Sequence, residues 1–136
     1  VPSFRYSVIT THAVLKLLHW KRVGMIYGPK AIMVLAKDIF VDLTGAEQEA
    51  GDYEWTILLS KGVATADEAD DAMDLVRQRD SRIIFTAAYA DEGSLMLCAA
   101  AQRGMSAPEY IFMLASGWWS QGFSQDRAPS TACSAE

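Results

Sequence analysis

Four short apolar runs punctuate this chain, at residues 22–27, 53–60, 82–88 and 109–114. Between successive runs lies a longer segment in which apolar residues recur with the 3.6-residue period of a helix. Strands that alternate with helices in this way form β-α units, and such units place their strands parallel in one sheet. We therefore expect an α/β protein built on four parallel strands.

The residues before the first run predict an opening helix. Residues 1–9 look extended, and Thr10 or Thr11 is suited to cap a helix that continues to about His19, since either hydroxyl can accept a backbone N–H of the first turn. The apolar residues that then share one face of this helix are Ala13, Val14, Leu17 and Leu18.

The second helix is expected to start in the turn at Pro29 and to stop at Gly45, where a glycine can adopt the left-handed conformation that ends helices. An acidic loop at 47–52 then leads to the second strand. Pro29 and Gly45 together set the expected start and end of this helix.

A capping box opens the third helix. The Thr65 hydroxyl can accept the N–H three residues on, and Glu68 can reach back. The acidic run 67–71 suits the positive end of the helix dipole, so we interpret it as a solvated helix start and not as a metal site. A fourth helix is predicted at 91–103 and closed by Gly104.

Right-handed crossovers make the expected strand order 2-1-3-4, in an open sheet with helices on both faces. In such a sheet ligands bind beyond the carboxyl ends of the strands, where the winding reverses between strands one and three. The side chains at those ends are aromatic, hydroxyl or absent, which suits binding by stacking and hydrogen bonds better than bond making. The candidate ligand-binding residues are Tyr27, Gly28, Ser60, Tyr89, Trp118 and Trp119.

Two readings remain open for the tryptophan pair, which is either a pocket wall or interface, or packs against Phe4 and Tyr6. The strand ends carry no nucleotide-binding glycine motif and no G-x-S-x-G elbow, so we expect no cofactor and no catalytic residue. His12 and His19 are interpreted as a surface and a helix-end residue, and Lys30 as a solvated lysine.

The composition limits the classes of function. The chain has 136 residues, of which 51% are hydrophobic and 21% charged, which fits one domain with a sizeable core. Its net charge of -5 and lack of a basic run argue against a nucleic-acid partner. Cys98 is expected to be a small buried hydrophobe, and Cys133, in a polar tail, could pair with a cysteine outside this chain.

The strand-helix joints resemble those of a known family. The stretches that carry the likeness are PSFR (2–5), AVLKLLHWKRVGMIY (13–27), RIIF (82–85), Ala99-Ala100 with Gly104-Met105, PEYIFML (108–114) and GWW (117–119). They resemble the receptor-family ligand-binding region, the type I periplasmic-binding-protein-like ectodomain of receptor guanylyl cyclases, natriuretic peptide receptors, type B GABA receptors and metabotropic glutamate receptors.

The resemblance implies that residues 1–123 form most of the second, membrane-proximal lobe of a two-lobed clamshell. The composition of residues 124–136, rich in serine, alanine, proline and charge, predicts a flexible tail. Such a lobe lies outside the plasma membrane, has no catalysis of its own, and binds a small-molecule or peptide ligand together with the first lobe, often within a receptor dimer. Tyr27, Ser60, Tyr89 and Trp118 would face the cleft. The family's usual acidic residue after the first strand is replaced here by Gly28-Pro29-Lys30.

A second hypothesis is a free-standing small flavodoxin-like α/β protein with an enzymatic or regulatory role, since that architecture shares the 2-1-3-4 order. A phosphorelay receiver of this kind would need an acidic phosphoacceptor at a strand end. Tyr27, Ser60 and Ala88 are not acidic.

Overall fold

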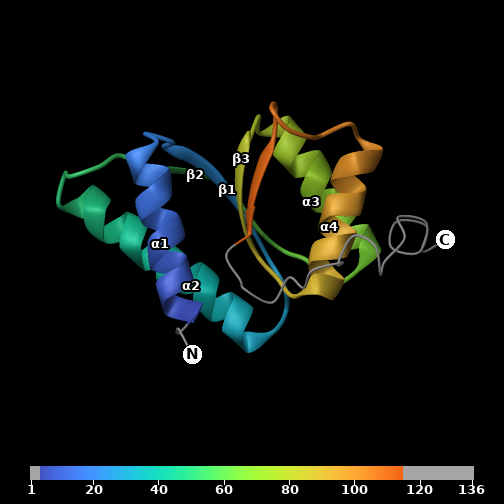
Figure 1. The fold of residues 1–136 in the computed structure, drawn as a ribbon, viewed down its shortest axis with the longest axis horizontal. Helices are drawn as coiled ribbons and strands as arrows, with labels where there is room; N and C mark the ends of the chain where they lie inside the picture. Colours follow the sequence, from blue (N-terminus) through green and yellow to red (C-terminus); the bar gives the residue numbers. More distant parts are fainter. Residues whose placement is uncertain (1–3, 115–136) are drawn as a thin grey trace.

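A computed structural model describes residues 4–114 of the chain, and within this part helices and strands alternate as the sequence predicts (Figure 1). The elements are α1 (Phe4–Leu17), β1 (Arg22–Tyr27), α2 (Ala31–Glu49), β2 (Thr56–Gly62), α3 (Ala66–Gln78), β3 (Ile83–Ala87), α4 (Ala90–Gln102) and β4 (Ile111–Leu114).

The four strands form one sheet in the order β2-β1-β3-β4, and every neighbouring pair is parallel. This confirms the predicted fold class and strand order. Figure 1 shows α1 and α2 on one side of the sheet and α3 and α4 on the other. Helices on both faces are the reason why the central strands are nearly continuous apolar runs.

The core lies on both faces of the sheet. On the α1–α2 side, the rings of Phe40 from α2 and Phe85 from β3 stack with centroids 4.6 Å apart. On the α3–α4 side, Met73, Ile84 and Met96 are fully buried in a second cluster. Arg103, just after α4, also joins the two helices, because it pairs with Asp70 and Asp74 of α3.

The opening helix differs most from its prediction. It begins at Phe4, so residues 4–9 are helical and not extended, and Thr11 is no cap, because its hydroxyl donates to the carbonyl of Ser7 one turn earlier. The cause is an inner face that starts before Thr10. Its buried members, at helical spacing, are Val8, His12 and Leu15.

The apolar face predicted for this helix is its outer face. Leu17 is 78% exposed and Leu18, just past the helix, is 45% exposed. The prediction chose the wrong side because His12 was taken for a surface residue, although it is only 5% exposed. When a histidine occupies a position on the inner face, a count of apolar residues alone does not detect the helical period of that face.

The second helix does not stop at Gly45. It continues to Glu49, and the left-handed glycine that follows is Gly51, at φ 72°. The helix begins at Ala31, with Lys30 as its N-cap, two residues later than Pro29 suggests. A lone glycine inside a helix costs about 0.5–1 kcal/mol relative to alanine, which tertiary packing can offset.

The other boundaries follow the sequence more closely. The Thr65 hydroxyl accepts the N–H of Glu68 at 3.2 Å, which confirms the predicted N-cap, and it donates to the Glu68 carboxylate at 3.2 Å. Gly104 closes α4 at φ 66°. β2 starts three residues later than predicted, because Tyr53 and Trp55 precede it and pack against the α1–α2 side of the core.

Cys98 is buried as expected, at 8% exposure, but it is disulfide-bonded and not a free thiol. The expectation of a simple buried hydrophobe is therefore wrong. The sequence has one other cysteine, Cys133, which lies outside the described residues, as does the predicted tail at 124–136.

Candidate functional site

The carboxyl ends of β1 and β3 lie side by side at the middle of the sheet, where the winding reverses. After β1, the N–H of Gly28 donates to the carbonyl of Ala87, which is the last residue of β3, at 2.9 Å. After β3, Tyr89 is the N-cap of α4, and no side-chain hydrogen bond caps that helix. The two strand ends therefore deliver the loops before α2 and α4 to one place.

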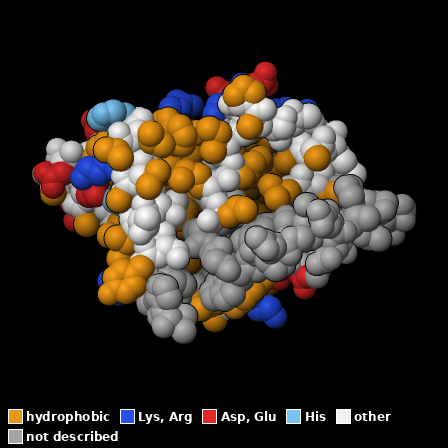
Figure 2. Space-filling view, in the orientation of Figure 1, with side chains coloured by type: hydrophobic (Ala, Val, Ile, Leu, Met, Phe, Trp, Pro, Cys, Tyr) orange, Lys and Arg blue, Asp and Glu red, His pale blue; other side chains and the backbone are white. Residues whose placement is uncertain are grey.

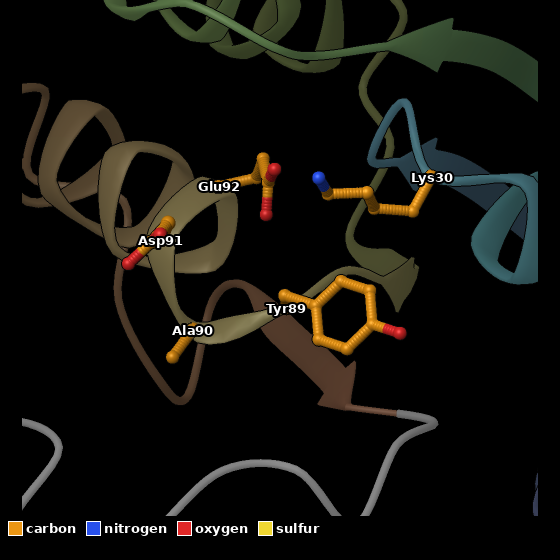
Figure 3. A pocket seen from close by; sticks show the side chains of 5 residues that line it. All are labelled: Lys30, Tyr89, Ala90, Asp91 and Glu92. Carbon is orange, nitrogen blue, oxygen red and sulfur yellow. The ribbon is translucent and has the colours of Figure 1, made fainter.

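A cleft of about 530 Å³ opens between these two loops (Figure 3). In Figure 3 the ammonium group of Lys30 and the carboxylate of Glu92 point toward each other across the cleft, and the ring of Tyr89 lies beside them. The residues that line it are Lys30, Tyr89, Ala90, Asp91 and Glu92.

Glu92 is the most unusual of these residues. Its Oε2 atom is buried, and no described group hydrogen-bonds to it. A Cβ atom at Gly28 would lie 3.7 Å from the Glu92 side chain, so the glycine keeps the backbone close to this carboxylate. No ion pair within 4.0 Å joins Lys30 to Glu92 in the described part of the chain. A buried acceptor of this kind gains from a donor that a ligand brings.

The charges around the cleft are mixed. Lys30 and the N-terminal turns of α2 and α4 favour an anionic group, because the backbone N–H groups of a first turn carry a partial positive charge. Asp91 and Glu92 favour a cationic or hydrogen-donating group. The arrangement can therefore orient a polar ligand by charge and stack it on Tyr89.

Only part of the predicted site meets at this cleft. Gly28 and Tyr89 lie at it, whereas the ring of Tyr27 lies beside Gly62 with the Lys37 ammonium 5.2 Å from its centroid. Ser60 sits within β2, opposite Met25, two residues before the strand ends. Trp118 and Trp119 lie outside the described residues.

The sequence prediction missed Lys30, which was set aside as solvated, and also Asp91 and Glu92. A signal for these residues was present, because each stands within five residues of a central strand end and at or inside a helix start. Lys30 was interpreted as solvated, and Asp91 was named only as the start of a helix. Only the distance across the two loops shows that the charged groups face each other.

No group of three or more histidine, cysteine, aspartate or glutamate side chains between residues 4 and 114 is arranged to hold a metal ion. None of the helices described there is long and apolar enough to cross a membrane.

A parallel α/β lobe with a polar cleft at its point of reversal is typical of ligand-binding domains. The model of one family, described as the receptor family ligand binding region, matches residues 1–132. The chain belongs to this family, which confirms the resemblance drawn from its strand-helix joints. No curated protein matches the chain in sequence.

Proposed function

We propose that this chain is a ligand-sensing lobe of the extracellular region of a membrane receptor, of the receptor guanylyl cyclase or class C G-protein-coupled receptor kind, with no catalysis of its own. The observation that carries the proposal is the family match over residues 1–132, together with a cleft at the reversal point between β1 and β3. Family membership favours this function over a free-standing flavodoxin-like protein.

The ligand, a small molecule or a peptide, binds at the carboxyl edge of the sheet. Tyr89 supplies an aromatic wall, Gly28 lets the ligand approach the backbone, and Lys30 and Glu92 supply opposite charges. The remaining proposed contacts are Tyr27, Ser60, Trp118 and Trp119, which belong to the same edge by sequence.

The cleft seen in this lobe is one wall of a larger site. A second lobe of the same receptor closes over the ligand, and contacts that the ligand makes with both lobes favour the closed state. Closure is then passed, within a receptor dimer, to an output domain beyond the membrane. The exposed position of the cleft, at the end of the sheet, is what such a closing surface requires.

The test uses the full-length receptor that contains this chain. Tyr89→Ala, Glu92→Gln and Trp118→Ala are each expected to raise the ligand concentration for half-maximal output by about tenfold or more, since each removes a contact made in the closed state. Leu35→Ala is the matched control, because Leu35 is 48% exposed on α2 and does not line the cleft.

Surface expression, measured by antibody binding, separates a lost contact from a misfolded receptor. If all three site variants reach the surface and respond with wild-type potency, the ligand does not bind at this edge and the proposal fails.

A further inference from the structure

The outer face of α1 is apolar and uncovered in the described part of the chain. Tyr6 is 65% exposed and Leu17 is 78% exposed, and Ile9 and Ala13 lie between them at the three- or four-residue spacing of one helix face. We call these four residues the α1 outer face. Figure 2 shows hydrophobic side chains gathered over α1 and beside it.

A groove of about 550 Å³ continues this face at the C-terminal end of α1. Its floor is the Tyr53 ring, and the ammonium groups of Lys16 and Lys21 lie 5.8 and 5.3 Å from the ring centroid. The residues that line the groove are Ala13, Lys16, Leu17, His19, Lys21 and Tyr53. An apolar side chain of a partner would fit between the aliphatic walls and this ring.

The charge around the groove is positive. Residues 4–22 contain four arginines and lysines and no aspartate or glutamate. Glu47 is turned inward, because its carboxylate accepts the indole N–H of Trp55 and pairs with Lys16. Lys21 makes no ion pair with any described residue. Asp52 and Glu54 flank Tyr53 in sequence but do not line the groove.

We propose that the α1 outer face and its groove dock an acidic amphipathic segment of a partner protein. An apolar side chain of that segment lies in the groove beside Tyr53, and its carboxylates pair with Lys21, which lines the groove. The groove lies at the amino ends of β1 and β2, whereas the ligand cleft lies at the carboxyl ends of β1 and β3. Docking therefore does not depend on the proposed ligand site.

Two other occupants fit less well. A second copy that placed its groove against this one would bring the Lys21 side chains of the two copies toward each other, and those like charges repel. A bilayer would cover the exposed leucines but would leave the concave groove without a side chain to fill it.

The experiment measures binding of a fluorescent helical peptide, with leucines on one face and glutamates on the other, to the 136-residue chain by anisotropy. A twin peptide with lysines in place of the glutamates is the charge control. Leu17→Asp and Lys21→Glu are each expected to weaken binding of the acidic peptide about tenfold or more, and high salt is expected to weaken it too. Leu35→Asp, on the exposed surface of α2, is expected to leave it unchanged.

The proposal is overturned if the acidic peptide does not bind, or if the lysine peptide binds equally well. Sedimentation that shows a dimer lost in Leu17→Asp would identify a second copy as the occupant instead. Co-sedimentation with anionic phosphatidylserine vesicles that depends on Leu17 would identify a lipid surface. Circular dichroism of the variants shows whether they remain folded, and since both substituted side chains lie at the surface, unaltered spectra are expected.

Discussion

At the scale of single residues, His12 shows how burial and charge compete. Its ring lies 4.8 Å from that of Trp55 and 5.6 Å from that of Phe40, and its Nε2 atom is 3.6 Å from the Glu47 carboxylate. Burial lowers the pKa of His12, and this effect exceeds the opposing one of Glu47, which raises the pKa. The neutral imidazole is therefore the form that the fold prefers.

The stability of the protein should depend on pH through this histidine. Because its pKa is lower in the folded state, the unfolded chain binds the proton first, and stability is lost as the pH falls below about 6.5. Urea unfolding between neutral and mildly acidic pH measures the loss. His12→Phe keeps a ring but cannot titrate, so we expect a flatter pH profile for it. An equally steep profile in that variant would assign the loss to other groups.

Two glycines give a paired test of packing. A Cβ atom at Gly24, in β1, would lie 2.5 Å from Ser81 Oγ and 3.2 Å from a methyl carbon of Leu59, so Gly24→Ala should destabilise the fold by about 1–3 kcal/mol. A Cβ atom at Gly45, inside α2, meets nothing within 4 Å, so Gly45→Ala should stabilise it by about 0.5–1 kcal/mol. Denaturation midpoints measure both. Changes of the same sign would show that local space does not control these sites.

These residues also mark the limit of sequence reasoning at this scale. The sequence alone does not show that Gly24 and Gly45 have different surroundings. Gly45 was interpreted as a helix stop because nothing local distinguishes a glycine within a helix from one beyond its end. Glu92 was likewise not predicted as a site residue, because its place at the cleft depends on Gly28 and Lys30, which follow a different strand. The sequence can locate Tyr89 and Gly28 because a strand end is a local feature, whereas contacts between loops are not.

At the scale of elements, two threonines that were both suited by sequence to cap a helix differ in the structure. Thr65→Ala removes the hydroxyl that accepts the Glu68 N–H, and should destabilise the protein by about 1 kcal/mol. Thr11→Ala removes only a hydroxyl that donates to Ser7 within α1, so we expect little change. Thermal unfolding compares the two. A larger loss at Thr11 would mean that α1 begins near that residue after all.

The first helix also shows why a face can be assigned to the wrong side. Ala13, Val14, Leu17 and Leu18 give the clearer apolar pattern, yet the side that packs carries Val8, His12 and Leu15. A polar residue that is buried by aromatic neighbours breaks the apolar count, and an exposed apolar outer face adds to it. Both departures come from the tertiary structure, and the second is what carries the docking proposal.

At the scale of the whole molecule, the sheet was predictable because chirality and strand adjacency leave few arrangements. Four apolar runs with helices between them, joined by right-handed crossovers, lead to the 2-1-3-4 order that the structure has. The sequence could not set the depth of the cleft, because that depends on how far two loops project. It could set the edge at which the cleft lies.

The same sheet predicts where the molecule is most stable. β1 pairs on both sides, with β2 and β3, and four of its six residues are buried, whereas β4 pairs only with β3 among the described strands and has no fully buried residue. In native-state hydrogen exchange, the bonded amides of β1 and β3 should therefore exchange only on global unfolding, and those of β4 should exchange earlier. Protection of β4 equal to that of β1 would show that a further element covers its outer edge. Because Gly28 and Tyr89 follow the two strands that we expect to be best protected, the proposed ligand contacts stand on the part of the lobe that should deform least in the proposed closure.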